Sequence, residues 1–250
     1  AEMRSIRKRM QIIFQDPISS LNPRRRVKNI VAEPLVISGV RNKDEIDYKV
    51  RKALSAVGMD PNITMDRRPH QFSGGQCQRI CIARALILEP DLIVCDEPVS
   101  ALDVSIQAQV MNLLIDLQED LGLAYLFISH DLAIVQHISH RVAVMYLGQI
   151  VEMADCDELF LNPFHPYTKA LLSAVPLFNQ KDKKKNKNLL TGDIPSPIER
   201  PSGCCFHTRC PFVMGRCKEE APTFQKIIIV AVLASLGVIL VAAYMLWLYK

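Results

Sequence analysis

Short apolar runs alternate along the first half of the chain with longer segments in which apolar residues recur every three or four positions. The short runs contain no charged residue and lie at 11–14, 92–95 and 123–129. The periodic segments are typical of helices and lie at 27–58, with a break near Ser38 and Gly39, and at 73–89, 104–121 and 132–139. An uninterrupted apolar run is typical of a buried parallel strand, so the two later runs predict such strands. The alternation therefore predicts an α/β fold with a mostly parallel sheet.

Local signals sharpen two of these predictions. The helix at 73–89 follows Ser73, a favourable N-cap residue, and ends before Pro90. The helix at 104–121 has one apolar stripe that we expect to face the core, formed by Val110, Leu113, Leu114, Leu117 and Leu121. Two further strands, at 142–146 and 150–153, flank a Leu-Gly-Gln turn and predict a β-hairpin.

Three domains are predicted from changes in composition. Residues 1–155 form the α/β domain, residues 156–224 form an extension rich in Pro and Cys, and residues 226–250 form a hydrophobic helix. The basic run at 181–187 is interpreted as a solvated linker. Because the net charge of +4 results from 30 basic and 26 acidic residues, charge gives no argument for nucleic-acid binding.

The last segment is long enough to cross a membrane. Residues 227–249 carry no charge, lie between Lys226 and Lys250, and have two tyrosines and a tryptophan near one end. At about 1.5 Å per residue, such a helix spans a bilayer core of about 30 Å. A buried core helix would show a polar face, and this segment has none. We therefore expect a membrane-spanning character, from either a fusion or frameshift near 223–226 or a genuine tail anchor.

Two sequence elements carry the strongest chemical signal. Ser73-Gly74-Gly75 at a helix start offers backbone N–H groups, a hydroxyl and the helix dipole to a phosphate. Asp96 and Glu97 follow the apolar strand at 92–95, where Asp96 is placed to hold Mg²⁺ and Glu97 to polarise a water molecule. Either element alone is commonly a turn or a solvated strand end, so the prediction of a phosphate and Mg²⁺ site depends on the two occurring together.

Further motifs occur in a fixed order around these two elements. They are Gln15 after the first strand, FSGGQ at Phe72–Gln76, LIVCDEP at 92–98, SALD ending at Asp103, and His130 after the next strand. This set resembles the nucleotide-binding subunit of ABC transporters. IIFQDPISSLNPR, DEPVSALDVSIQAQVMNLL and NPFHPYTKALLSAVP are similar to the ATPases of dipeptide and oligopeptide importers, a group that includes nickel importers. RKRMQIIFQDP and FSGGQ suggest the second of the two ATPases, and the similarity covers about residues 1–224.

The resemblance implies a RecA-like P-loop NTPase core with a helical subdomain at about 27–89. In such enzymes two subunits enclose two ATP molecules. The implied roles are Mg²⁺ binding for Asp96, general base for Glu97, and γ-phosphate contacts for Gln15 and His130. Ser73, Gly74, Gly75, Gln76 and Asp103 would face the nucleotide of the partner ATPase. The implied partners are that ATPase, two permease subunits and an extracytoplasmic solute-binding protein, which place the chain at the cytoplasmic face of the inner membrane.

One family motif is missing. No Gly-Lys-Ser or Gly-Lys-Thr, the end of the phosphate-binding P-loop (Walker A), occurs in the 250 residues. In the family this loop precedes Gln15 by some tens of residues, so we expect a fragment truncated at its N-terminus that does not hydrolyse ATP alone. Cys77 and Cys81 also depart from the family, which favours Arg at the first position and Gly near the second. We interpret both as small buried thiols of a reducing cytosol.

Four of the eight cysteines gather near the C-terminus, within GCCFHTRCPFVMGRC. Cys204, Cys210 and Cys217 have a spacing that suggests metal or iron–sulfur ligation. Some members of the family bind a [4Fe–4S] cluster there, but the fourth cysteine is absent from this chain. A structural loop without a cluster, or a zinc site completed by His207, are the alternatives.

Other functions fit fewer of these features. A non-catalytic, membrane-tethered module that presents the signature surface to a partner ATPase accounts for the tail and for the missing P-loop. A nickel or other solute importer is a second alternative, because the permease and the binding protein select the substrate. An ABC ATPase that acts on DNA or ribosomes does not account for the Cys-rich extension.

Overall fold

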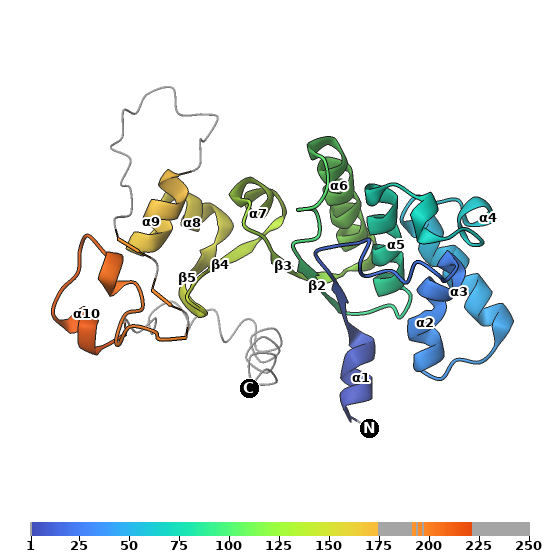
Figure 1. Cartoon of the computed structure of the whole chain (residues 1–250), viewed down its shortest axis with the longest axis horizontal. Coiled ribbons are helices and arrows are strands. Elements are labelled where there is room, and N and C mark those ends of the chain that lie inside the picture. Colours follow the sequence, from blue (N-terminus) through green and yellow to red (C-terminus); the bar gives the residue numbers. More distant parts are fainter. Residues whose placement is uncertain (1, 175–191, 194, 197, 222–250) are drawn as a thin grey trace. The chain divides into compact units, whose positions relative to one another are not determined.

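The structure, a computed structural model, describes residues 2–174, 192–193, 195–196 and 198–221 (Figure 1). It divides into two compact units, Ala1–Ile138 and Ser139–Lys250. Each unit has its own sheet and is described by itself. The predicted domain boundary at residue 155 stays a prediction, and the predicted membrane-spanning segment 227–249 lies outside the described residues. Within the described residues, no helix combines the length and apolar character needed to cross a membrane.

The first unit has a parallel three-stranded sheet, as predicted. Strands β1 (Met10–Ile13), β2 (Leu92–Asp96) and β3 (Ala124–Ile128) are hydrogen-bonded in the order β1-β2-β3. Ile13 is opposite Cys95, and Asp96 is opposite Ile128, so the carboxyl ends of the three strands meet at one edge. Residues that directly follow these strands are therefore brought close together.

Several helices of the first unit form a group to one side of its sheet (Figure 1). The helices of this unit are α1 (Glu2–Arg9), α2 (Val27–Ile37), α3 (Lys43–Ala56), α4 (Pro61–Thr64), α5 (Gly74–Leu86), α6 (Val104–Leu121) and α7 (Leu132–Ile138), with a 3-10 turn at Pro69–Gln71. Helix α5 packs against α2, α3, α6 and β1 and lies at the centre of the core. The predicted break near Ser38 and Gly39 is the end of α2, where Gly39 adopts a positive φ of 96°.

Three details differ from the predictions. Helix α5 ends at Leu86 rather than Glu89, because Glu89 adopts a left-handed φ of 51°. On α6, Met111 is buried, whereas Leu121 in the last turn is 53% exposed. Strand β3 is not buried on both faces: its burial alternates, and Leu126 and Ile128 are 39% and 46% exposed.

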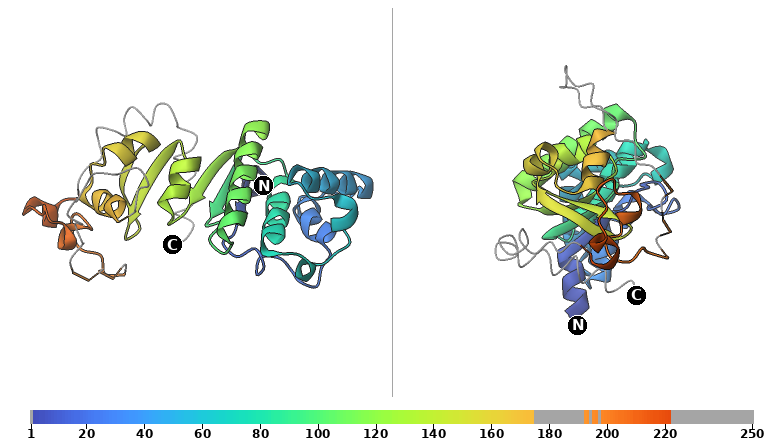
Figure 2. Two further views of the ribbon diagram at one scale, coloured as in Figure 1. Left: turned by 90° about the horizontal axis from the view of Figure 1, so that it is seen from above. Right: turned by 90° about the vertical axis from the view of Figure 1, so that its left-hand side faces the viewer.

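The second unit begins with an antiparallel hairpin, as predicted. Strands β4 (Arg141–Tyr146) and β5 (Gln149–Asp155) are joined by Leu147 and Gly148, which both have positive φ, as a two-residue hairpin turn requires. The other elements are α8 (Cys156–Leu161), α9 (Pro166–Ser173), a 3-10 turn at His207–Arg209 and α10 (Arg216–Glu219). The hairpin, α8 and α9 are the yellow elements of Figure 2.

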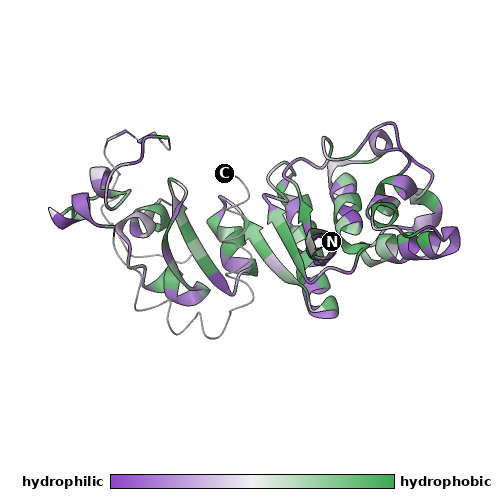
Figure 3. Ribbon diagram, turned by 90° about the horizontal axis from the view of Figure 1, so that it is seen from below, coloured by the Kyte–Doolittle hydropathy of each residue, from purple (hydrophilic) through white to green (hydrophobic). Residues whose placement is uncertain are grey.

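An aromatic cluster forms the core of the second unit. The ring centroid of Tyr146 lies 4.7 Å from that of Tyr167 and 5.3 Å from that of Phe206. Phe206 is fully buried. Edge-to-face and tilted contacts between aromatic rings stabilise a fold by more than the burial of their apolar surface alone. Colouring by hydropathy shows the strands of both sheets mainly in the hydrophobic colour (Figure 3).

Candidate functional site

Glu97 lies at the carboxyl edge of the parallel sheet in an unusual backbone conformation. It directly follows β2 and adopts a φ of +44°, which is strained for a residue with a side chain. Its N–H donates to the carbonyl oxygen of Ile128 at 3.0 Å, and its own carbonyl accepts from Ser100 Oγ at 3.0 Å. Strain of this kind persists where surrounding contacts fix the backbone, as they do here.

The three residues predicted to be catalytic are brought together at this edge. Gln15 Nε2 donates to Glu97 Oε2 at 2.8 Å, and His130 Nδ1 lies 2.9 Å from Glu97 Oε1. Gln15 follows β1, Glu97 follows β2, and His130 follows β3. Both carboxylate oxygens of Glu97 therefore have a partner, each supplied by a neighbouring strand end.

The Glu97 and His130 side chains differ in their exposure to solvent. The Glu97 side chain is 23% exposed, so water can reach it, whereas the His130 side chain is 74% exposed. The hydrogen bond to Glu97, followed by the negative charge of Glu97, raises the pKa of His130 above its ordinary value.

Asp96 is the neighbouring carboxylate and ends β2 in a half-buried position. One carboxylate beside a solvent-accessible edge fits Mg²⁺, which keeps most of its waters and takes its other ligands from substrate phosphates. A small cavity of about 70 Å³ at the same edge is lined by residues following β2 and β3, namely Glu97, Val99, Ser100, Gln107, Ser129, His130, Asp131 and Ile134.

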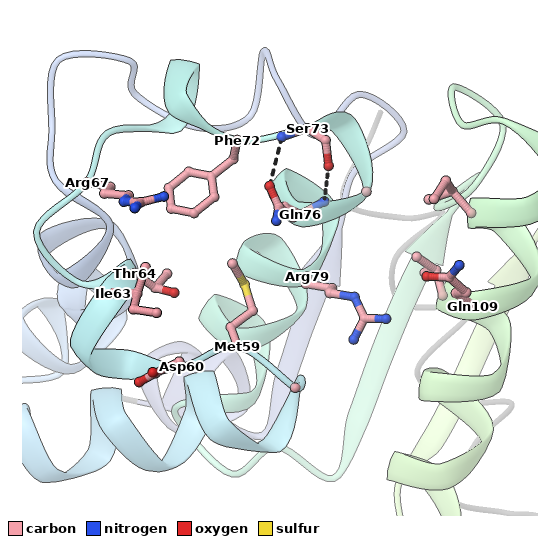
Figure 4. A pocket seen from close by; sticks show the side chains of 14 residues that line it. Met59, Asp60, Ile63, Thr64, Arg67, Phe72, Ser73, Gln76, Arg79 and Gln109 are labelled. Carbon is pink, nitrogen blue, oxygen red and sulfur yellow. Dashed lines mark hydrogen bonds between the residues drawn. The ribbon is translucent and has the colours of Figure 1, made fainter.

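The predicted signature forms the beginning of α5. Ser73 is the N-cap residue, and its Oγ accepts from Gln76 N at 3.4 Å while Gln76 Oε1 accepts from Ser73 N at 3.0 Å (Figure 4). This reciprocal pair fixes the helix start. Ser73 and Gln76 are exposed, so this end of the helix is open to a ligand.

Glycine at position 75 is required by close packing against α6. A Cβ added to Gly75 would lie 2.4 Å from Ile106 Cγ2, whereas one added to Gly74 would meet Leu102 Cδ2 at 3.4 Å. Asp103, the residue preceding α6, is exposed and makes no side-chain cap. Gly75 therefore packs closely on α6, and Gly74 lies beside Leu102, the residue that precedes Asp103 in the chain.

A cavity of about 440 Å³ lies beside the signature (Figure 4). Ser73, Gly75 and Gln76 line it together with two cationic side chains, Arg67 and Arg79. The sequence interpretation missed both arginines. The only signal for Arg79 was its place three residues after Gln76 on the same helix.

The C-terminal cysteines lie close together in the second unit without forming a metal site. Cys204 N donates to Cys217 O at 2.9 Å, and burial, together with the nearby Cys204 and Cys217 thiols, raises the pKa of Cys210. Cys204, Cys205, Cys210 and Cys217 form no disulfide bond. Among the described residues, no group of three or more His, Cys, Asp or Glu side chains is placed to hold a metal ion.

Two known families match this chain. Residues 1–100 match the family described as ABC transporter, and residues 151–217 match the family described as the C-terminal region of oligopeptide/dipeptide transporters. Among solved structures, cbiO1 of Clostridium perfringens, part of the ABC transporter complex cbiONQ, has a TM-score of 0.56 and 31% identity and covers 62% of this chain and 61% of its own. The α/β ABC ATPase fold is thereby confirmed.

Curated relatives extend the match over most of the chain. The oligopeptide transport ATP-binding protein OppF of Escherichia coli is 56% identical over 227 residues, which are 90% of this chain and 67% of that protein. The oligopeptide transport ATP-binding protein AppF of Bacillus subtilis is 53% identical, over 89% of this chain and 68% of that protein. The chain therefore belongs to the family of ATP-binding subunits of oligopeptide and dipeptide ABC transporters.

Proposed function

We propose that the chain works as an ATP-binding subunit that powers an importer of oligopeptides. The observation that carries this function is the pairing of Glu97 with Gln15 and His130 at the carboxyl edge of the sheet. The names of the relatives, OppF and AppF, supply the substrate class.

Each residue at the sheet edge has a role in this proposal. Glu97 accepts a proton from the attacking water, and Gln15 and His130 hold its carboxylate in place. His130 also contacts the γ-phosphate in this proposal, and its hydrogen bond to Glu97 raises the pKa of its imidazole. Asp96 would hold Mg²⁺, which offsets the negative charge of the transferring phosphate.

The signature is proposed to act on a nucleotide that a second ATPase subunit holds. Ser73, Gly74, Gly75 and Gln76 surround the open N-terminal end of α5, and Asp103 lies exposed before α6. Exposed N–H groups at a helix start attract phosphate. Two permease subunits and a solute-binding protein complete the proposed importer, with this chain peripheral to the inner membrane.

ATP-dependent association with the partner ATPase subunit of the same importer tests this proposal. We expect Ser73→Arg to abolish the complex measured by analytical ultracentrifugation, because a long cation would fill the space needed by the partner's nucleotide. Ser55→Arg is the matched control, since Ser55 is exposed near the end of α3. An association that survives Ser73→Arg would contradict the proposal.

A [4Fe–4S] cluster held by Cys204, Cys210 and Cys217 stays a prediction. Their proximity supports it, but the described side chains lack a metal-binding arrangement. Iron and sulfide analysis of the chain purified without oxygen, compared with Cys217→Ser, decides between a cluster and a structural loop.

A further inference from the structure

The segment after Gln15 folds into a compact turn at residues 16–21. The side chain of Asp16 organises it, because Oδ1 accepts from Ile18 N at 2.8 Å and from Ser19 N at 3.3 Å. At the end of the turn, Leu21 is 1% exposed and anchors the segment in the core. The turn is therefore ordered by local hydrogen bonds and held at one end by burial.

Two side chains of α5 fix this turn to the signature helix. Arg84 Nη1 donates to the carbonyl oxygen of Ser20 at 2.7 Å. Cys81 Sγ lies 3.2 Å from Ser20 Oγ and donates to Pro17 O at 3.7 Å. Cys81 and Arg84 are three residues apart and thus share one face of α5. Burial raises the pKa of the Cys81 thiol, so the thiol keeps the proton that it donates.

These contacts connect the two parts of the candidate site, which are the Glu97 carboxylate at the sheet edge and the signature at the start of α5. Gln15 directly precedes the turn and donates to Glu97 at 2.8 Å. Helix α5, which carries Cys81 and Arg84, begins at the Ser73 cap. The Glu97 carboxylate is thus linked to the helix that presents the signature by the Gln15 hydrogen bond, by the backbone from Gln15 into the 16–21 turn, and by the hydrogen bonds of that turn with α5.

We propose that Cys81 and Arg84 are positioning residues for the proposed ATPase site. By fixing the 16–21 turn to α5, they hold Gln15 where it reaches Glu97 and tie that contact to the helix carrying the signature. The role of these contacts in ATP hydrolysis rests on the proposed function. Cys81 is buried, as the sequence predicted, and the contacts with the 16–21 turn add a positioning role to that burial.

A physical argument supports a positioning role. Gln15 is exposed and has a flexible side chain, so holding its amide against Glu97 costs conformational entropy. A backbone that is already fixed lowers this cost, because only the side-chain rotamers remain to be ordered. Arg84 and Cys81 are the described side chains outside the turn that hydrogen-bond to the backbone of Pro17 or Ser20.

Two measurements on the full 250-residue chain test the proposal. Amide hydrogen exchange of residues 16–21 reports whether the turn is held. An NMR titration of the His130 ring reports whether Gln15 still contacts Glu97, since His130 shares that carboxylate. A loss of packing elsewhere would not move the pKa of this exposed ring.

Arg84→Ala is compared with Arg79→Ala, a matched control. Arg79 lies on the same helix and donates from Nη1 to Val57 O, also at 2.7 Å. We expect Arg84→Ala to accelerate exchange in the 16–21 turn at least tenfold and to shift the pKa of His130 with the sign that Gln15→Ala produces. Arg79→Ala should do neither.

Cys81 supplies a milder pair of variants in case Arg84→Ala fails to fold. Cys81→Ala removes the side-chain hydrogen bonds and should accelerate exchange in the turn, whereas Cys81→Ser keeps a donor and should restore protection. Unchanged exchange in both Arg84→Ala and Cys81→Ala would overturn the inference. If Gln15→Ala itself leaves the pKa of His130 unchanged, the proposed carboxylate site is wrong, and the exchange data still decide whether these residues hold the turn.

Discussion

Nδ1 of His130 lies 2.9 Å from Oε1 of Glu97, and the two residues follow adjacent parallel strands. The contact exists because β2 and β3 end at the same edge of the sheet. It also raises the pKa of His130, because a carboxylate that accepts from an imidazole stabilises the protonated ring.

Replacing Glu97 by Gln should lower the pKa of His130 toward its ordinary value of about 6.5. The hydrogen bond to Glu97 is the largest cause of the raised pKa and the charge of Glu97 is the next, so both favourable effects are lost together. Asp131 contributes least, and Asp131→Asn is therefore the matched control, with a smaller shift expected. An NMR titration of the histidine rings measures both, and equal shifts in the two variants would contradict the assignment.

The same contact predicts a pH dependence of stability. Because the pKa of His130 is higher in the folded than in the unfolded chain, its contribution is fully present below about pH 6.5 and is lost as pH rises through the folded value. Denaturant unfolding at several pH values should show this decline in the original chain. In His130→Gln the decline assigned to this group should disappear, and an unchanged pH profile would count against the prediction.

Gly75→Ala should destabilise the first unit by about 1–3 kcal/mol, because the added methyl overpacks the interface of α5 and α6. Its Cβ would lie 2.4 Å from Cγ2 of Ile106, a β-branched side chain with little freedom to move. Gly74→Ala is the neighbouring control, with 3.4 Å to Leu102 Cδ2, and should change stability far less. Denaturant midpoints compare the two, and equal destabilisation would argue against the close approach at position 75.

In the second unit, Glu152→Ala should destabilise by about 1–3 kcal/mol for each backbone N–H left without an acceptor. The side chain lies in β5, is 4% exposed, and accepts from Phe164 N at 2.6 Å and His165 N at 3.0 Å. It thereby fixes the segment before α9. Glu158→Ala, at an exposed position of α8, makes the same truncation without burial and should be nearly neutral in thermal unfolding. A comparable loss of stability in both variants would show that the two hydrogen bonds of Glu152 do not stabilise the second unit.

The Glu97 site was predictable from the sequence because each of its residues comes shortly after a strand, and the same pattern occurs three times. Gln15, Glu97 and His130 each follow a strand that the apolar pattern marks, and parallel strands bring their carboxyl ends together. The hydrogen bonds of Cys81 to Pro17 O and of Glu152 to Phe164 N and His165 N were not predictable in this way, since these partners lie 64 and 12 or 13 residues away and are backbone atoms that any sequence supplies. Periodicity also does not show whether a second layer covers a strand, which explains the incorrect prediction that β3 is buried on both faces.

The cysteines should separate into two classes toward a thiol reagent. Six are buried, and burial raises the pKa of Cys95 to about 12, so its reactive thiolate is on the order of one part in ten thousand at pH 8. Cys210 and Cys217 are partly exposed, although the pKa of Cys210 is raised by burial. We therefore expect maleimide to modify Cys217 first, then Cys210, and the remaining six only after unfolding, as mass spectrometry of digested protein can show. Modification of Cys95 in the folded chain at a rate near that of Cys217 would contradict its place in the core between β1 and β3.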